Sequence, residues 1–208
     1  MQGAILSPLL FCIYLNGLPL ATKTCCIESY VDDSKILISF SIKDSTSAKQ
    51  NLEKYLLRVA AWCCTNNLLI NAEFLLIATR HMLQKLLEDL SLFFLGKLIT
   101  PVTTAKDLGV TLDCNLTYDN HINKLTASCV SQLCQINRVK NSFDSNTLQL
   151  IISALVMSKL FYCSTVWSNI ANSNIKKLQG VQNFACRITT GTRKFDQILI
   201  ISPQHYRS

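Results

Sequence analysis

The chain has 208 residues, of which 49% are hydrophobic and 16% are charged, so it can bury a substantial core as one large or two small domains and is not a disordered protein. No apolar run reaches the roughly 18 to 20 residues that cross a bilayer, which excludes a transmembrane helix. All of the excess positive charge of +7 lies after residue 120, where 10 Lys and Arg accompany two Asp, whereas residues 1–120 hold 10 Lys and Arg and 11 Asp and Glu.

The first predicted element is a buried helix over residues 5–16. Pro8 lies in its first turn, which tolerates proline, and Asn16-Gly17 supplies a stop. Residues 4–15 are apolar enough for a signal-peptide core, but Pro8 interrupts the run and no basic residue precedes it. We therefore expect an intracellular protein of the cytoplasm or nucleus that is not secreted.

A β-hairpin is predicted next. Residues 26–31 and 35–40 are rich in strand formers and flank the turn formers Asp32-Asp33-Ser34. Paired acids at a hairpin tip are often ordinary solvated turn residues. They can also be metal ligands when apolar strands hold them rigidly at a sheet end, because Mg²⁺ prefers hard oxygen donors.

The rest of the first part alternates helix and strand. A helix is predicted over residues 45–66, with Asp44 and Ser45 as caps. Strands are predicted at 75–79, at 90–95 turning through Gly96 into 98–100, and at 108–112. The fold class expected for residues 1–115 is therefore α+β.

From residue 119 onward the pattern is helical. The predicted helices cover residues 121–141, 145–160, 161–170 and 174–190, with Asp144-Ser145 as the cap of the second. The sequence thus predicts a second domain over residues 116–208, an all-helical basic lobe. Excess positive charge is typical of a surface that binds a polyanion, nucleic acid being the commonest, although an ordinary solvated basic surface has the same composition.

The ten cysteines include the adjacent pairs Cys25-Cys26 and Cys63-Cys64 and lie among apolar residues. Adjacent cysteines in apolar surroundings are unlike a secreted disulfide scaffold, so we expect buried, reduced thiols.

Two segments near the N-terminus resemble a known family. Tyr30-Val31-Asp32-Asp33 is similar to the tyrosine-x-Asp-Asp motif of reverse transcriptases, and residues 2–11 resemble their proline-glutamine-glycine block and its helix. The order and spacing of the two segments also fit. The particular likeness is to the reverse transcriptases of LINE-type (non-long-terminal-repeat) retrotransposons, jockey/CR1-like.

The resemblance extends over nearly the whole chain. Trp62 to Asn71 resembles the segment after the palm helix, and Asp107 to Asp113 resembles the primer-grip hairpin. The thumb and its continuation are matched by short segments: His121-Ile122, Ile136-Asn137, Val166-Trp167-Ser168 and Gln182 to Ile188.

The resemblance implies a partial polymerase palm with the primer-grip hairpin, followed by an all-α thumb-like lobe. It implies RNA-directed DNA polymerase activity with Mg²⁺, an RNA template, a DNA primer and deoxynucleoside triphosphates. Asp32 and Asp33 would form the metal site, with Asp32 the firmer ligand. Tyr30 would approach the primer end. Gln2 and Gly3 would lie beside the incoming nucleotide and the template, and Leu108 and Gly109 would help to hold the primer strand.

Two departures from the family weaken this expectation. Family members carry another catalytic aspartate on a strand ahead of the glutamine-glycine block, whereas the first acid here is Glu28. The segment Asn71-Ala72-Glu73-Phe74 is also shorter than its counterpart and lacks a lysine that lies near the triphosphate. We therefore expect weak or absent Mg²⁺ binding and no polymerase activity from this chain alone.

The main alternative is a non-enzymatic nucleic-acid-binding protein that uses the basic lobe through Lys176, Lys177, Arg193 and Lys194. A secreted or membrane-associated protein that enters through its apolar N-terminus is the weaker alternative. Trp62 and Trp167 are expected to be core or interface aromatics, and His121 a helix-start residue rather than a catalyst. Gln2 and Gly3 have the simple alternative of preceding a helix.

Overall fold

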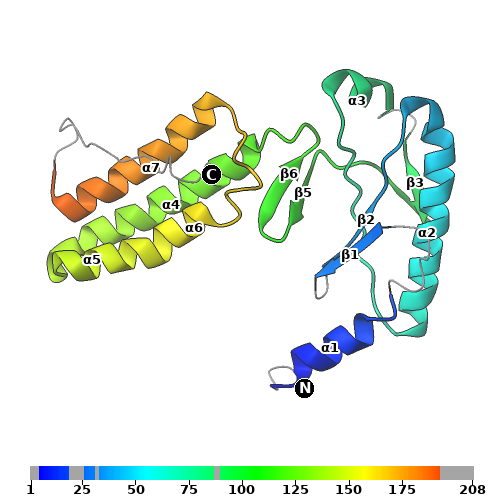
Figure 1. Ribbon diagram of the computed structural model, residues 1–208, viewed down its shortest axis with the longest axis horizontal. Helices are drawn as coiled ribbons and strands as arrows, with labels where there is room; N and C mark the ends of the chain where they lie inside the picture. The colour runs from blue at the N-terminus through cyan, green and yellow to red at the C-terminus, as the bar shows by residue number, and fades with distance from the viewer. Residues whose placement is uncertain (1–4, 19–25, 31–32, 87–89, 193–208) are drawn as a thin grey trace, which may run out of the picture. The chain divides into compact units, whose positions relative to one another are not determined.

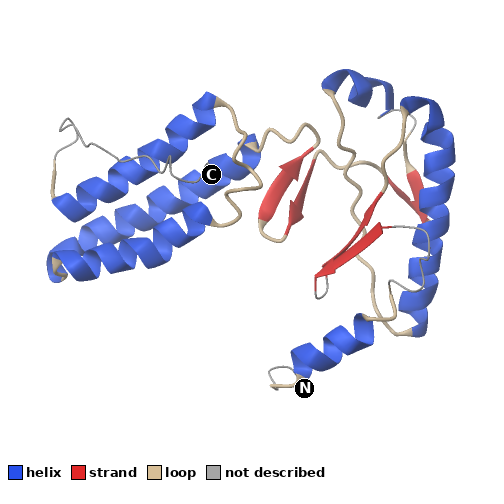
Figure 2. Cartoon of the chain, in the orientation of Figure 1, coloured by secondary structure: helices blue, strands red, loops and turns tan. Residues whose placement is uncertain are grey.

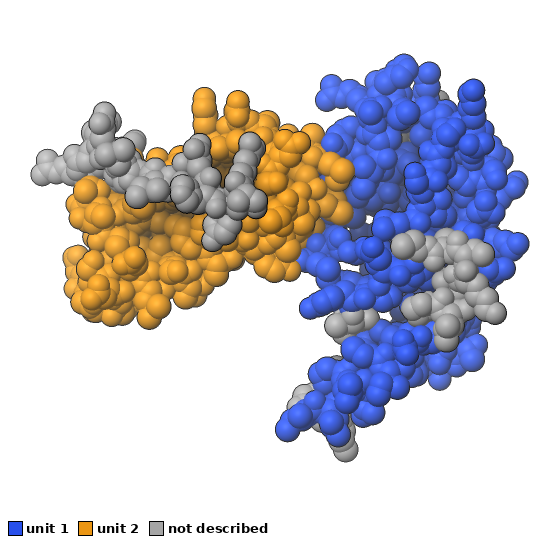
Figure 3. All heavy atoms as spheres, in the orientation of Figure 1, with its two compact units in different colours: residues 1–109, 113–115 blue, residues 110–112, 116–208 orange. Residues whose placement is uncertain are grey.

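The computed structural model describes residues 5–18, 26–30, 33–86 and 90–192, and its order of elements is shown in Figure 1. The predicted α+β class is confirmed: short strands and helices alternate up to residue 113, and helices follow. The chain divides into two compact units (Figure 3). Unit 1 is Met1–Gly109 with Asp113–Asn115, and unit 2 is Val110–Leu112 with Leu116–Ser208.

The described strands form three small two-stranded sheets (Figure 2). Each strand has three to five residues and pairs with its neighbour in sequence. The pairs are β1 (Cys26–Tyr30) with β2 (Asp33–Leu37), β3 (Leu92–Phe94) with β4 (Lys97–Ile99), and β5 (Thr104–Asp107) with β6 (Val110–Asp113).

Helix α1 (Ser7–Leu15) forms where predicted, but it is not buried. Most of its apolar side chains are exposed, for example Leu10 at 62% and Ile13 at 63%. Its C-terminal end contacts Trp62: the Tyr14 ring lies 6.3 Å from the Trp62 ring, and a Cβ added to Gly17 would lie 3.3 Å from the Trp62 indole nitrogen. The prediction of burial was wrong because, among the described residues, no sheet covers the helix.

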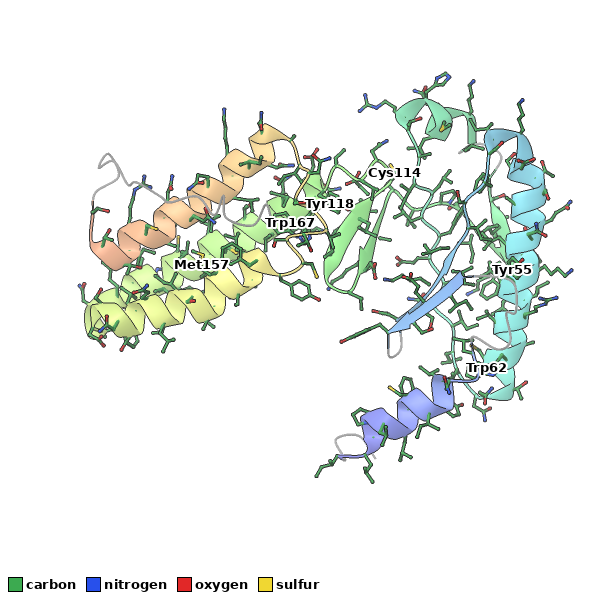
Figure 4. The ribbon with its side chains drawn as sticks, in the orientation of Figure 1. Tyr55, Trp62, Cys114, Tyr118, Met157 and Trp167 are labelled. Carbon is green, nitrogen blue, oxygen red and sulfur yellow. The ribbon has the colours of Figure 1, made fainter. Side chains whose placement is uncertain are left out.

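Helix α2 (Ser45–Thr65) follows the 3-10 turn η2 (Ile42–Asp44) and confirms the predicted helix. It packs on β3, where the Glu53 carboxylate accepts a hydrogen bond of 3.0 Å from the Phe93 amide. The Trp62 side chain lies at its C-terminal end (Figure 4). Asp44 occupies the N-cap position without a side-chain capping bond, whereas Ser41 accepts a hydrogen bond from the Lys43 amide of η2.

Residues 75–86 differ from the sequence prediction in two ways. The strand predicted at 75–79 is reduced to a single bridge between Leu75 and Val102. Helix α3 (Arg80–Leu86) was not predicted, since its seven residues are too few to establish a helical period. Leu83 and Leu86 of this helix bury themselves with Leu76 and Leu90 in a small core.

Apart from the β6 residues Val110–Leu112, the described part of unit 2 is helical, as expected for residues after 116. Its elements are α4 (Asp119–Val139), η3 (Lys140–Ser142), α5 (Ser145–Ile152), the π-helical turn η4 (Ser153–Met157), α6 (Ser158–Phe161) and α7 (Asn172–Thr190). The predicted Asp144 cap is confirmed, because its carboxylate accepts hydrogen bonds from the Asn146 and Thr147 amides at 3.0 and 3.1 Å.

The helix predicted at 161–170 does not form. Residues 162–167 instead make a series of turns in which Cys163 has a left-handed φ of 50°. The Trp167 indole N–H closes these turns by donating to the Tyr162 carbonyl at 3.3 Å. Trp167 is 5% exposed and lies in the core of unit 2 near Tyr118 (Figure 4), as expected for a core aromatic.

The core of unit 2 is built on one face of α4. The face consists of Ile122, Leu125, Cys129, Leu133 and Ile136, which recur every three or four residues and pack against α5, η4 and α7. Three of them, Ile122, Cys129 and Leu133, are fully buried.

Eight cysteines whose side chains the structure describes are free, which confirms reduced thiols for them. Of these eight, only Cys63 and Cys129 are buried, so the expectation of general burial was wrong. In the part of the chain that the structure describes, no helix is both long enough and apolar enough to cross a membrane.

Candidate functional site

The acidic motif lies at the end of the β1–β2 hairpin. The two strands are antiparallel, and their last register pair is Tyr30 with Asp33. Asp33 and Ser34 therefore belong to strand β2 rather than to the predicted turn. Asp32, like Gln2 and Gly3, lies outside the described residues.

One face of this hairpin carries the charged and aromatic side chains. Residues i and i+2 of a strand share a face, and so do directly opposed residues of an antiparallel pair. Tyr30, Asp33, Glu28 and Lys35 therefore share a face, since Glu28 is the register partner of Lys35. Tyr30 is 65% exposed and Asp33 is also exposed, so both are accessible to a substrate.

The opposite face of the hairpin carries no charged side chain among the described residues from 27 to 36. Ile27 and Ile36 are register partners on it, and both are half-buried. Ser29 and Ser34 are the adjacent pair, with hydroxyl oxygens 3.0 Å apart. This packing fixes which way the acidic face points.

An ion pair joins the acidic face to strand β5. The Lys35 Nζ lies 2.6 Å from Asp107 Oδ1, with both side chains about a third exposed at 30% and 27%. Asp107 is the last residue of β5, and Leu108 follows it directly. The structure thus places Tyr30 and Asp33 in one unit with Leu108 and Gly109, and the ion pair links them through two residues to which the sequence had assigned no role.

Leu108 and Gly109 form the turn between β5 and β6 rather than the start of a strand, which corrects the strand predicted at 108–112. Their φ angles are 42° and 89°, the left-handed pair that a two-residue hairpin turn requires. Leu95 and Gly96 of the β3–β4 turn have φ angles of 47° and 77°. The backbone form of the Leu108–Gly109 turn is therefore a general hairpin feature and not a mark of function.

The donor chemistry at the hairpin end suits a hard metal ion. Asp33 supplies an exposed carboxylate, the kind of oxygen donor that Mg²⁺ takes. Among the described residues no three His, Cys, Asp or Glu side chains are grouped as a metal site. The other predicted ligand, Asp32, is not among those residues.

The predicted basic residues of unit 2 divide into three groups. Lys176 is exposed on α7. Lys177 donates to Asn123 Oδ1 at 2.6 Å and to Asn174 Oδ1 at 3.1 Å, so its ammonium group is already engaged. Arg193 and Lys194 lie outside the described residues. Of the two described lysines, Lys176 is the one more available to a phosphate.

Asn174 was missed by sequence reasoning. It is fully buried, and its amide donates to Asp119 Oδ1 at 2.6 Å, which ties the first turn of α7 to the first turn of α4. An asparagine in a first helical turn reads as an exposed residue, so no signal in the sequence distinguishes it.

His121 lies in the first turn of α4, as predicted, and has a packing role. It is 8% exposed, its Nδ1 accepts a hydrogen bond of 3.3 Å from the Thr111 amide, and its ring lies 6.0 Å from that of Trp167. Burial lowers the pKa of the His121 imidazole. The neutral ring therefore holds strand β6 to helix α4 within unit 2.

Comparison with known proteins identifies relatives over most of the chain. A protein named "Probable RNA-directed DNA polymerase from transposon BS", of Drosophila melanogaster, is 27% identical over 201 residues, which cover 91% of this chain and 22% of the relative. The RNA-directed DNA polymerase from mobile element jockey is 26% identical in Drosophila melanogaster, over 91% of this chain and 21% of the relative. The Drosophila funebris jockey protein is 27% identical with the same two coverages.

No family model and no solved structure matches the chain. The chain spans about a fifth of the length of the curated relatives it matches, 22% in the case of the transposon BS protein. The match nevertheless runs through both units, and it agrees with the motif resemblance. Over 91% of its length the chain is therefore similar to the RNA-directed DNA polymerases of jockey-like, LINE-type retrotransposons.

Proposed function

We propose that this chain is the part of an RNA-directed DNA polymerase that supplies metal-binding carboxylates and a primer-contacting turn. The reaction is the addition of deoxynucleotides to the 3′ end of a DNA primer on an RNA template. The observation that carries the proposal is the Tyr30–Asp33 register pair, which ends the β1–β2 hairpin with an exposed carboxylate beside an exposed phenol. The relatives supply the reaction, since they are named for it.

In this proposal Asp32 is the firmer Mg²⁺ ligand and Asp33 its neighbour. Bound Mg²⁺ would offset the negative charge of the reacting phosphate and orient it. Tyr30, on the same face as Asp33, would contact the primer end, and Leu108 and Gly109 the primer strand. Gln2 and Gly3 would lie beside the incoming nucleotide and the template.

Metal binding can be tested on this chain directly. Titration with Mn²⁺, a paramagnetic substitute for Mg²⁺, should broaden the Ser34 amide signal in NMR spectra, because Ser34 follows both predicted ligands. Asp32→Asn and Asp33→Asn should abolish the broadening, since the amide keeps the shape of the carboxylate and loses its charge. Glu28→Gln, which removes an exposed carboxylate from the same hairpin face, is the matched control and should leave it intact.

Broadening at Ser34 that persists unchanged in both Asn variants would contradict the metal assignment. Primer extension by this chain on a primed RNA is expected to be undetectable, because the chain represents only 22% of a relative such as the transposon BS protein. Incorporation that disappears in Asp32→Ala would show the opposite, a polymerase site that functions within these residues.

Nucleic-acid binding without catalysis is the second candidate. It is favoured by the concentration of positive charge after residue 120 and by the exposed Lys176. Binding to RNA or DNA should weaken steeply with salt, because each neutralised phosphate releases counterions. Lys176→Gln should lower the slope of log affinity against log salt by about 1 if Lys176 contacts a phosphate.

The control for this measurement is Lys97→Gln, which removes an exposed lysine from strand β4 in unit 1. It should leave the slope unchanged. Absence of any retention on RNA or DNA at low salt would remove this candidate.

A further inference from the structure

We infer that Lys35 and Asp107 are a positioning pair that fixes the Leu108–Gly109 turn relative to the acidic end of the β1–β2 hairpin. The inference rests on the proposed function, since it assigns these two residues to the placement of the primer-contacting turn. The resemblance assigned no role to either residue, although Asp107 begins the segment that resembles the primer-grip hairpin.

The ion pair connects strand β2 to strand β5 close to the predicted functional residues of each. Lys35 is two residues after Asp33 in β2, so their Cα atoms are about 7 Å apart and their side chains share a face. Its ammonium group is bonded to Asp107, which immediately precedes Leu108. The ion pair therefore connects the elements at the ends that carry their predicted roles.

Lys35 pairs with a residue outside its own hairpin. Glu28 lies directly opposite Lys35 in the hairpin register, and cross-strand pairs of opposite charge are common partners. The Lys35 ammonium nevertheless lies 2.6 Å from Asp107, a residue of another hairpin. Lys35 thus links two hairpins instead of stabilising the pairing of strands within one hairpin.

The backbone between Asp107 and the Leu108–Gly109 turn is stiff. Leu108 and Gly109 make a two-residue turn with both φ angles left-handed, which leaves little freedom between Asp107 and the turn. A fixed Asp107 carboxylate therefore fixes the turn as well. The position that Lys35 gives to the end of strand β5 therefore also sets the position of the turn.

The ion pair should position the Leu108–Gly109 turn without adding much to the stability of the chain. Ion pairs that are as exposed as this one contribute little to stability, because water screens them and both side chains lose freedom. Removal of the pair should therefore leave the melting temperature of the chain almost unchanged. The distance between the turn and the acidic hairpin end is what should change.

The experiment measures Mn²⁺-induced relaxation of three amide protons in this chain. Ser34 reports binding at the hairpin end, Gly109 reports the position of the turn, and Gly96 of the β3–β4 turn is the reference. Mn²⁺ is added until the Ser34 effect saturates, so that changes in affinity do not enter. The variants are Asp107→Asn and the matched control Glu28→Gln, which makes the same chemical change in the register partner of Lys35.

We expect Asp107→Asn to lose most of the relaxation at Gly109 while Ser34 and Gly96 keep their values. Glu28→Gln should change none of the three. The charge-reversed double variant, Lys35→Glu with Asp107→Lys, should restore the Gly109 effect, whereas a merely structural role would not respond to the exchange of charges. The melting temperature is measured alongside each variant.

The inference and the proposed function fail differently. If Mn²⁺ does not affect Ser34 in the unmodified chain, the metal site of the proposed function is wrong and the inference falls with it. If Ser34 responds but Gly109 is equally relaxed in Asp107→Asn and Glu28→Gln, only the positioning role is overturned. Loss at Gly109 accompanied by a large fall in melting temperature would likewise overturn it, because the pair would then be a structural support.

Discussion

Replacement of His121 by asparagine should remove a pH dependence from the stability of unit 2. The His121 Nδ1 accepts a hydrogen bond from the Thr111 amide, so the single proton of the neutral ring is on Nε2. The Nε2 atom is buried, with no hydrogen-bond partner among the described residues. Protonation of the ring would therefore add a charge to a buried site and take away the acceptor that Thr111 uses.

The sign of the effect follows from the lowered pKa of His121. Because the folded pKa lies below the unfolded value of 6.5, the unfolded chain binds more protons in the interval between the two. Stability from this residue is present above pH 6.5 and is lost as the pH falls from there through the folded pKa. The slope in that interval is at most about 1.4 kcal/mol per pH unit for one proton.

Asparagine is the informative replacement because its side-chain oxygen can still accept from the Thr111 amide. At neutral pH we expect a loss of about 1–2 kcal/mol, from the missing ring contact with Trp167. Urea unfolding followed by the emission of Trp167, in a Trp62→Phe background, reports on unit 2 alone, since the chain has two tryptophans. The unmodified chain should lose more stability than His121→Asn between pH 7.5 and pH 5.

Other titrating groups contribute equally to both proteins, so the difference between the two pH profiles isolates His121. Parallel profiles would refute the argument, and so would an unmodified chain that gains stability relative to the variant as the pH falls. Either result would mean that the imidazole is solvated or finds a partner when it is charged.

Two further predictions concern unit 2. Leu133→Ala should lower the free energy of unfolding in urea by about 2–5 kcal/mol, because Leu133 is fully buried with 0% of its surface exposed to solvent. Leu150→Ala, at a position that is 69% exposed, should lower it by less than about 0.5 kcal/mol, and equal losses would contradict the assigned core. Asp144→Ala should lower stability at neutral pH, since hydrogen bonds from Thr147 lower the pKa of the Asp144 carboxyl, and the deficit should vanish as the pH falls through that lowered pKa; a deficit that is unchanged in acid would show that the charge is not involved.

Helical spacing, cap residues and turn residues correctly predicted two long helices, one helix cap and two hairpins. Helices α2 and α4 follow from apolar residues at helical spacing over 21 residues each, a pattern long enough to be unambiguous. The Asp144 cap and the two hairpins around Asp33 and Gly96 follow from turn and cap chemistry. Such features need few long-range contacts, so the sequence carries most of the information.

Features that depend on distant contacts were not predictable. The exposure of α1 depends on what packs over it, and the turns at residues 162–167 depend on Trp167 reaching the Tyr162 carbonyl. In the candidate site, the resemblance indicated Asp33 and Leu108 but gave no reason to pair Lys35 with Asp107. That pairing brings together residues of two hairpins far apart in sequence, and no local pattern encodes it.

The proposed metal ligands and the proposed nucleic-acid-binding lysine belong to different units, so we expect that mutation can separate the two proposed functions. Tyr30, Asp33 and the Lys35–Asp107 pair all belong to unit 1, whereas Lys176 and most of the excess positive charge belong to unit 2. At 0.1 M salt, exposed charges more than about 10 Å apart are largely screened from each other. If the two proposed sites are separate, a substitution in one should leave binding at the other unchanged.

Asp33→Asn should therefore abolish the Mn²⁺ effect at Ser34 and leave the salt dependence of nucleic-acid binding unchanged, while Lys176→Gln should do the reverse. If each variant changes both measurements, the carboxylates and the lysine act on one shared site and the assignment of separate tasks to the two units is wrong. If the effects separate, nucleic-acid affinity in this chain requires no metal, and the binding function of unit 2 can persist without the polymerase reaction.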